Sequence, residues 1–321
     1  MRPRVLITRR WPEEVERQLA ERFDVTLNEA DVPLGAADLA VAMAEYDVLC
    51  PTVSDRVDAA VIAGGHRVKL IAHYGVGFEH IDIEAARARS IAVSNTPGVL
   101  TDATADIALT LILMAARRAG EGEREVRAGG WTGWRPTHLL GASLTGKVLG
   151  LAGFGRIGIA TARRAHHGFG MKIAYYGRRE ALPDVVRELD AEFYPDLHEL
   201  LAVSDFVSLH TPGGAETANL IDAQALAAMK PGSYLINTAR GGVVDHAALA
   251  DALRGGHLAG AGLDVYPAEP TVPDELVGLE NVVLLPHLGS ATRETRIAMG
   301  ERALANVIAW AEGRPLPDRI A

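Results

Sequence analysis

Three side chains capable of acid, base and anion-binding chemistry occur in the second half of the chain. Arg240, Glu269 and His287 each follow a short apolar run at 233–237, 260–264 or 282–285. Short apolar runs bounded by Gly, Pro or polar residues are typical of buried strands. Strands of one parallel sheet end at the same edge, where ligands bind in open α/β sheets. We therefore expect the three side chains to converge on one site.

The chemistry of these three residues suits the reduction of a carbonyl group beside a carboxylate. The planar guanidinium of Arg240 can bind a carboxylate through two hydrogen bonds. A protonated His287 can donate a proton to a carbonyl oxygen as hydride arrives at its carbon. An ionised Glu269 beside it favours the charged imidazole and orients it. Each residue alone is explained as an ordinary surface or strand-end residue, but the set favours catalysis.

A glycine-rich turn near the middle of the chain predicts a nucleotide site. Gly153-Phe-Gly155-Arg-Ile-Gly158 follows an apolar run at 148–152 and precedes a helical stretch at 159–168. In such a motif the glycines allow a tight turn, close approach of a pyrophosphate and close packing of helix on strand. The helix N-terminus then offers free N–H groups to the phosphates. Alone, this motif could equally be a plain strand–helix turn.

The next predicted strand ends without the acidic residue that usually binds the adenosine ribose. Gly177, Arg178 and Arg179 stand there instead. Two guanidinium groups beside a small residue would attract a 2′-phosphate. We therefore expect NADP(H) to be preferred, with NAD(H) also usable. Alternatively, the two arginines are simply solvated basic residues at the start of the next helix.

Composition limits the remaining possibilities. The chain has 321 residues, of which 48% are hydrophobic, which indicates two α/β domains. The net charge of −9 argues against a nucleic-acid or anionic-membrane partner. A single cysteine, Cys50, excludes an intramolecular disulfide and a zinc site built from several cysteines. The apolar run at the N-terminus is too short for a signal peptide, and the most apolar helix, 107–116, is too short for a membrane span. We expect a cytoplasmic protein.

The order of predicted elements indicates two doubly wound α/β domains. One long helix is expected to start near Thr101 or Asp102 and to run past Arg118 towards residues 129–130. Either Thr101 or Asp102 could cap it, and a final helix is expected at 292–312. Because the nucleotide motif lies mid-chain, we predict a Rossmann-type dinucleotide-binding domain (99–289) inserted in a smaller flavodoxin-like substrate domain (1–98 and 290–321). Strands are expected at 5–8, 25–27, 48–50, 69–72, 91–93, 148–152, 171–176, 206–210, 233–237, 260–264 and 282–285.

Together the motifs resemble the D-isomer-specific 2-hydroxyacid dehydrogenases. The resemblance implies that Arg240 anchors the substrate carboxylate, that Glu269 is its acidic partner in the site, and that His287 donates the proton. The matching stretches extend over most of the chain: Tyr74-Gly-Val-Gly77, Thr104-Ala-Asp106, Gly153 to Gly158, His210-Thr-Pro212, Asn237-Thr-Ala-Arg240-Gly-Gly, Leu263-Asp264-Val, Glu269-Pro and Pro286-His287-Leu-Gly-Ser-Ala291.

The same resemblance implies further binding residues. Backbone N–H groups of Val76 and Gly77 would bind the substrate carboxylate, and Asp264 would bind the nicotinamide carboxamide. Cofactor contacts are also implied at Thr104, Arg156, Ile157, His210, Thr211, Pro212, Thr217, Thr238, Ala239 and Gly289. The loop 213–217 departs from the family pattern, which usually has Leu and Pro there, so its cofactor contacts are less firmly implied.

Within the family, the stretches 95–106, 133–136 and 176–179 look most like the glyoxylate/hydroxypyruvate reductases, many of which use NADPH. This implies NADPH-dependent reduction of a small 2-oxoacid, glyoxylate or hydroxypyruvate, to the D-2-hydroxyacid. It also implies a homodimer formed through the long helix and the Trp-rich stretch. Trp131 or Trp134 would either cap the partner's site or simply pack the dimer.

Other functions find less support in the sequence. The stretch 141–147 has the spacing of a phosphate loop but lacks its Ser or Thr, and His198 lacks the second His of a zinc-protease helix. The adjacent His166 and His167 point to different helix faces, so no metal is expected. Two rivals stay open: another hydride donor, such as formate or phosphite, and a non-catalytic NAD(H)-sensing protein. A formate enzyme would be expected to carry an amide in place of Glu269.

Overall fold

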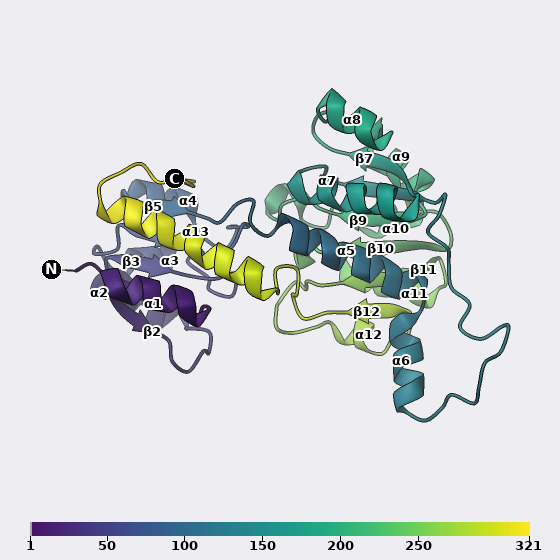
Figure 1. The fold of residues 1–321 in the computed structure, drawn as a ribbon, viewed down its shortest axis with the longest axis horizontal. Helices are drawn as coiled ribbons and strands as arrows, with labels where there is room; N and C mark the ends of the chain where they lie inside the picture. Colours follow the sequence, from purple (N-terminus) through teal and green to yellow (C-terminus); the bar gives the residue numbers. More distant parts are fainter. Residues whose placement is uncertain (1) are drawn as a thin grey trace. The chain divides into compact units, whose positions relative to one another are not determined.

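The computed structural model describes residues 2–321, which form two compact units. One unit consists of the chain up to Leu100 together with Ala291–Ala321, and the other is Thr101–Ser290. The second unit is therefore inserted between two segments of the first. Figure 1 shows each unit as a sheet covered by helices on both faces.

The first unit has a five-stranded parallel sheet with the order β2-β1-β3-β4-β5. This is the flavodoxin-like order of a doubly wound sheet. The three central strands, β1, β3 and β4, are short, and all of their residues except Arg4 are buried. The strands are β1 (Arg4–Ile7), β2 (Asp24–Leu27), β3 (Val48–Cys50), β4 (Leu70–Ala72) and β5 (Ala92–Ser94).

Amphipathic helices cover both faces of this sheet. On one face, α1 (Glu13–Arg22) and α13 (Arg293–Ala311) bury Val15, Leu19 and Leu304 in a single core. A Cβ on Gly300 would meet Val15 at 2.9 Å, so these two helices pack closely at that glycine. The opposite face is covered by α2 (Ala36–Glu45), α3 (Ala59–Ala63) and α4 (Ile83–Ala88).

The second unit has a seven-stranded parallel sheet with the order β12-β11-β10-β9-β6-β7-β8. Counted along the unit, the order from β8 to β11 is 3-2-1-4-5-6, the Rossmann arrangement, and β12 adds a seventh strand at the edge. The strands are β6 (Val148–Ala152), β7 (Lys172–Tyr176), β8 (Glu192–Tyr194), β9 (Phe206–Leu209), β10 (Ser233–Asn237), β11 (Leu258–Leu263) and β12 (Val282–Leu284).

Two separate cores lie on the two faces of the larger sheet. One is formed with α5 (Thr101–Ala116), α7 (Arg156–Arg163) and α8 (Pro183–Leu189). The other is formed with α9 (Leu197–Val203), α10 (Ala223–Ala228), α11 (His246–Arg254) and α12 (Asp274–Val277). Figure 1 shows α5 running along its face of the sheet. The predicted fold of two parallel-sheet α/β units is confirmed.

The single long helix expected from Thr101 to residues 129–130 is wrong. Helix α5 ends at Ala116, and a separate helix, α6 (Ala119–Arg127), begins after Arg118, whose φ is 52°. The carbonyl of Ala116 accepts a hydrogen bond from the N–H of Ala142 at 2.8 Å. The returning chain thus takes the acceptor that another helical turn would need. Helix α5 already includes Thr101 and Asp102, so neither residue precedes it as a cap.

Two other local predictions need adjustment. The helix expected at 159–168 starts earlier, at Arg156, and its last turn, Arg164–Gly168, is a π-helix. Strand β8 was not expected, because it is a run of only three residues at the sheet edge. No helix among residues 2–321 is both long enough and apolar enough to cross a membrane.

Candidate active site

Neighbouring strands of the larger sheet carry the three candidate catalytic residues. Strands β10, β11 and β12 lie side by side, and Arg240, Glu269 and His287 follow their carboxyl ends in that order. The side chains of Glu269 and His287 meet directly, with Nδ1 of the imidazole 2.7 Å from Oε2 of the carboxylate. The expected convergence at one sheet edge is therefore present in the structure.

The Glu269 carboxylate is held in its ionised form. Burial raises its pKa, but the hydrogen bond and charge of His287, the N–H of Tyr266 and the charge of Arg240 together hold the pKa below its usual value. Its other oxygen, Oε1, accepts the Tyr266 N–H at 3.0 Å. Because Nδ1 of His287 faces Glu269, Nε2 is the ring nitrogen left to face a substrate.

The loop that carries His287 is fixed by Asp264. His287 has a φ of 56°, a left-handed conformation that is uncommon for a residue with a Cβ. Its N–H donates to the Asp264 carbonyl at 3.0 Å. The Asp264 carboxylate accepts the N–H groups of Leu288 at 2.6 Å and Gly289 at 2.8 Å. Thr104 completes the support, since its hydroxyl donates to the Gly289 carbonyl at 3.0 Å.

This arrangement gives Asp264 a role that the motif alone did not indicate. The side chain is 1% exposed, and burial, outweighing the two N–H groups, raises its pKa. Both carboxylate oxygens are engaged by backbone N–H groups beside His287. The nicotinamide contact implied by the family resemblance stays a prediction, whereas the contact with the His287 loop is observed.

A buried asparagine shapes the loop of Arg240. Asn237, the last residue of β10, is fully buried. Its side chain donates to the Arg240 carbonyl at 2.9 Å and accepts the Ala239 N–H at 2.9 Å. Gly241 follows, and a Cβ there would overlap the backbone of Tyr266, so the loop of Arg240 packs against the turn leading to Glu269. Asn237 is a supporting residue that the sequence motifs did not indicate; a buried amide closing a strand was the available signal.

The start of α11 supports the same loop. Asp245 caps the helix by accepting the Ala248 N–H at 3.0 Å, as its position predicts. His246 is buried, and its Nε2 lies 3.1 Å from the Gly241 carbonyl. Burial lowers the pKa of His246 despite that carbonyl, so the ring stays neutral and donates to it. His246 is a second supporting residue that the motif analysis did not identify.

The geometry of the glycine-rich turn fits a dinucleotide. Gly153 has a φ of 96°, and a Cβ there would come within 2.7 Å of the His210 carbonyl. A Cβ on Gly158 would overlap the Gly153 carbonyl, whereas one on Gly155 would meet nothing within 4 Å. Gly155 therefore faces open space beside the first turn of α7, whose start has no side-chain cap. Free N–H groups in such a place suit a phosphate, with Arg156 and Ile157 in that first turn.

Two buried hydroxyl groups further along the same edge also fit a bound cofactor. The Oγ1 atoms of Thr211 and Thr238 are buried and have no hydrogen-bond partner among the described residues. Buried polar atoms are almost always paired, and a ligand bound at this edge would supply the partner that these two hydroxyl groups lack. Ala239 follows Thr238 directly at the end of β10.

His210 and the loop after it are also ordered at this edge. The His210 ring bonds Ser208 Oγ through Nε2 at 2.9 Å, and burial lowers its pKa to about 4, so the ring is neutral. Thr217 holds the loop that begins at Pro212 by donating to the Pro212 carbonyl at 2.7 Å. The predicted adenosine end, Gly177 to Arg179, follows β7, and both arginine side chains are exposed.

Val76 and Gly77 belong to the smaller unit. The Val76 carbonyl accepts the side-chain N–H of Asn95 at 2.8 Å, and the Gly75 carbonyl accepts the Thr96 N–H at 2.9 Å. These contacts fix the loop whose N–H groups are expected to bind a carboxylate. The Tyr74 hydroxyl, just before it, donates to the Arg296 carbonyl of α13.

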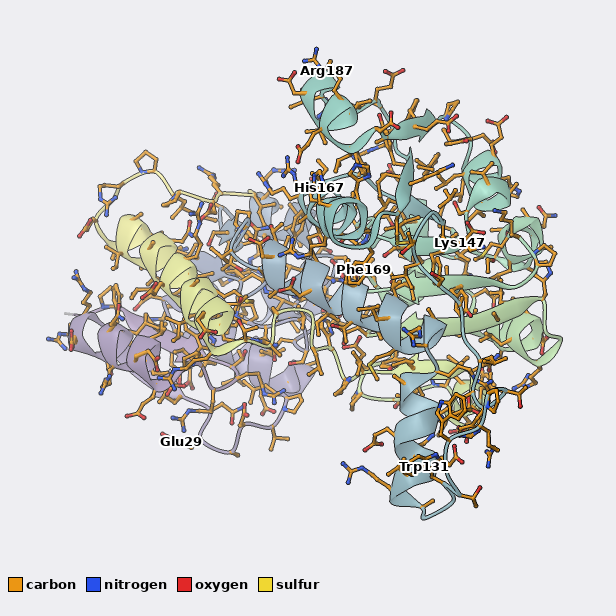
Figure 2. The ribbon with its side chains drawn as sticks, turned by 45° about the vertical axis from the view of Figure 1, so that its right-hand side comes forward. Glu29, Trp131, Lys147, His167, Phe169 and Arg187 are labelled. Carbon is orange, nitrogen blue, oxygen red and sulfur yellow. The ribbon has the colours of Figure 1, made fainter. Side chains whose placement is uncertain are left out.

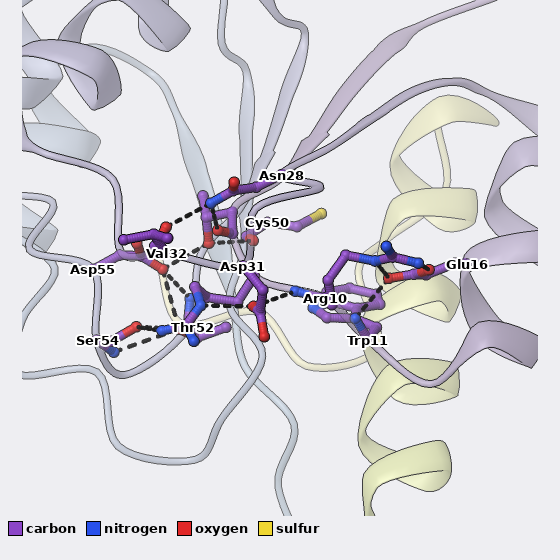
Figure 3. A network of polar contacts seen from close by, with 12 residues as sticks. Arg10, Trp11, Glu16, Asn28, Asp31, Val32, Cys50, Thr52, Ser54 and Asp55 are labelled. Carbon is purple, nitrogen blue, oxygen red and sulfur yellow. Dashed lines mark hydrogen bonds and ion pairs between the residues drawn. The ribbon is translucent and has the colours of Figure 1, made fainter.

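A polar network supports the same end of the smaller sheet (Figure 3). Asp55 is fully buried and accepts the Thr8 hydroxyl at 2.6 Å and the Thr52 N–H at 2.7 Å. Buried Glu16 accepts two bonds from the Arg10 guanidinium and one from the Trp11 N–H. The Trp11 ring packs on Tyr74 with centroids 4.7 Å apart, which links this network to the Val76 loop.

Metal-binding geometry is not found in the described part of the chain. Among residues 2–321, no group of three or more His, Cys, Asp or Glu side chains is arranged to hold a metal ion.

Comparison with known proteins agrees with this geometry. Residues 109–289 match the family model described as D-isomer specific 2-hydroxyacid dehydrogenase, NAD binding domain. A glyoxylate reductase of Thermococcus litoralis is 47% identical, over 100% of this chain and 97% of its own length. The crystal structure of the NADPH-dependent glyoxylate/hydroxypyruvate reductase of Sinorhizobium meliloti, in complex with NADP and malonate, aligns with a TM-score of 0.89 at 35% identity, covering 100% of this chain and 97% of the other.

A further solved structure supports the same assignment. The glyoxylate reductase of Paecilomyes thermophila aligns with a TM-score of 0.87 at 32% identity, covering 99% of this chain and 98% of the other. The match extends across both units and is not limited to the nucleotide motif. The chain therefore belongs to the D-isomer-specific 2-hydroxyacid dehydrogenase family of NAD(P)-dependent oxidoreductases.

Proposed function

We propose that this chain reduces a small 2-oxoacid, glyoxylate or hydroxypyruvate, to the D-2-hydroxyacid with NADPH. The observation that carries the proposal is the 2.7 Å contact between Glu269 and His287 at the end of the strands, with Nε2 left for the substrate. The glyoxylate reductases among its relatives support the choice of oxoacid. In this proposal the unit of residues 1–100 and 291–321 binds substrate, and the inserted unit binds the dinucleotide.

Each catalytic side chain has one task. Arg240 binds the substrate carboxylate through its guanidinium fork, together with the N–H groups of Val76 and Gly77. His287 donates the Nε2 proton to the carbonyl oxygen as the carbon is reduced, and Glu269 keeps the imidazole charged and oriented. The bound dinucleotide supplies the hydride.

A steady-state screen tests the activity. Glyoxylate, hydroxypyruvate, pyruvate and phenylpyruvate are each offered with NADPH and with NADH, and dinucleotide oxidation is followed. We expect glyoxylate or hydroxypyruvate to give the highest kcat/KM. A His287→Ala variant should lose about 10²–10⁴-fold in kcat while NADPH binding is kept, since general acids contribute this much.

The alternatives predict different outcomes of the same screen. If the dinucleotide is oxidised with none of the oxoacids but still binds tightly, the result would support a sensing role in place of catalysis. Reduction of NAD⁺ by phosphite or formate would instead identify another hydride donor. An unchanged kcat in the His287→Ala variant would remove His287 as the proton donor.

The proposed preference for NADPH rests on Arg178 and Arg179, which follow β7 and are exposed. Arg178 lies 3.9 Å from Glu216, a loose pair of exposed groups that a 2′-phosphate could replace. Changing both arginines to Ser should raise the KM for NADPH about tenfold or more and leave that for NADH nearly unchanged, because even one lost charge-assisted bond costs about 1.5–3 kcal/mol. Arg187→Ser, on the exposed face of α8, is the control. A wild-type preference for NADH would contradict the assignment.

We also propose that two copies of the chain associate through α6 and the segment after it. No residue of α6 is buried, and Trp134 is 82% exposed. Trp131, labelled on this segment in Figure 2, and Leu140 are exposed as well. A groove of about 340 Å³ beside them is lined in part by Arg118 and Leu140. Sedimentation should show a dimer that Trp134→Ser weakens; a monomer at all concentrations would refute this.

A further inference from the structure

Tyr266 lies in the turn between β11 and Glu269 and is 7% exposed. Its hydroxyl oxygen is 2.9 Å from the carbonyl of Leu285 and 3.3 Å from that of Leu263. A phenol has one proton to donate, so the shorter contact, to Leu285, is the stronger bond. Leu285 is two residues before His287, so the ring of Tyr266 reaches the loop that carries the proton donor.

The main chain of Tyr266 contacts the other two catalytic loops. Its N–H donates to Glu269 Oε1 at 3.0 Å, which fixes the carboxylate on the side away from His287. Its carbonyl group lies so close to Gly241 that a Cβ there would overlap it, which brings the loop of Arg240 against the same turn. One residue therefore touches all three loops whose side chains form the candidate site.

We propose that Tyr266 is a positioning residue that sets the geometry of the Glu269–His287 pair. This inference rests on the proposed function, because it assigns Tyr266 a task in that site without contact with the reacting atoms. The left-handed φ of 56° at His287 has to be maintained by contacts on both sides. Asp264 holds the two residues after His287, and the Tyr266 hydroxyl holds the segment before it.

The hydroxyl remains a donor under all ordinary assay conditions. Burial, together with the nearby charges of Asp264 and Glu269, raises the pKa of Tyr266 to about 12. The bond to Leu285 is thus present throughout the pH range of ordinary assays.

Tyr266→Phe removes only the hydroxyl and tests the proposal. We expect kcat for the oxoacid to fall about tenfold, equivalent to about 1.4 kcal/mol. The KM for NADPH should stay unchanged. Tyr234→Phe is the matched control: Tyr234 is 8% exposed and lies near the other end of its strand, β10.

A second measurement separates this proposal from the proposed function. In protein labelled with ¹⁵N-histidine, the Nδ1 proton of His287, assigned with His287→Gln, reports the bond to Glu269 whether or not any oxoacid is reduced. We expect this signal to weaken or shift in Tyr266→Phe and to be unchanged in Tyr234→Phe. An unaltered signal, or an active variant with wild-type kcat, would overturn the positioning role. A lowered unfolding temperature with both readouts unchanged would show a purely structural role.

Discussion

Replacing Glu269 by Gln removes both a charge and a hydrogen-bond acceptor from the candidate site. In the wild-type chain, Oε1 accepts the Tyr266 N–H at 3.0 Å and Oε2 lies 2.7 Å from Nδ1 of His287. Glutamine has one acceptor oxygen, so its amide nitrogen would have to face one of these two donors. With the imidazole protonated, the variant can therefore keep at most one of the two contacts.

The electrostatic part of the effect follows from the exposure of the pair. Opposite unit charges about 4 Å apart attract by about 1 kcal/mol in water and about 4 kcal/mol at an effective dielectric constant near 20. The side chains of His287 and Glu269 are 30% and 33% exposed, so solvent screens them and the lower half of that range applies. A loss of about 1–2 kcal/mol in the transition state corresponds to a rate about 5–30-fold lower.

The assay is kcat/KM for oxoacid reduction with NADPH. Reduction needs a proton from the His287 imidazole, and Glu269 holds this ring through its 2.7 Å contact, so kcat/KM in Glu269→Gln should fall about 5–30-fold. Glu301→Gln, an exposed residue of α13, is the control for removal of a carboxylate. A kcat/KM that stays at the wild-type value would refute the idea that this carboxylate supports the proton donor.

Two further substitutions address the loops that hold the site. Asp264→Asn places an amide nitrogen against one of the two backbone N–H groups beside His287. It should lower the free energy of unfolding by about 2 kcal/mol and the unfolding temperature by about 4–8 °C, with a lower kcat. Equal melting curves and rates would contradict this. Gly241→Ala introduces a Cβ into the backbone of Tyr266 and should destabilise the fold by about 1–3 kcal/mol, measured by denaturant unfolding. Gly242→Ala, whose Cβ would meet nothing within 4 Å, is its control, and equal stability of the two variants would refute the packing argument.

Several features of the fold could be predicted because they depend on local patterns. Short apolar runs mark the strands, since central parallel strands are buried on both faces. The positions of Arg240, Glu269 and His287 after three such runs were enough to predict a shared sheet edge. The glycines at 153 and 158 occupy positions where a Cβ would overlap backbone, so their spacing alone indicates the turn.

Other features depend on contacts between distant segments. The chain breaks between α5 and α6 because the N–H of Ala142 takes the Ala116 carbonyl, and nothing within the helical pattern itself indicates this. Strand β8 escaped prediction because a run of three residues, Glu192–Tyr194, is too short to stand out as a strand. The family resemblance implies only a nicotinamide contact for Asp264. The structure shows in addition that the Asp264 carboxylate accepts two N–H groups of the His287 loop.

The sequence by itself determined which chemical groups the site can use and the strand ends from which they come. A guanidinium, a carboxylate and an imidazole after three neighbouring strands are facts of residue order and of parallel-sheet geometry. Only the tertiary structure decided how they are held: which carboxylate oxygen faces Nδ1 of His287, and how Tyr266 and Asp264 secure the loop around it. The physical reason is that these hydrogen bonds join loops separated in sequence, whose conformations exist only once the sheet and its helices have packed.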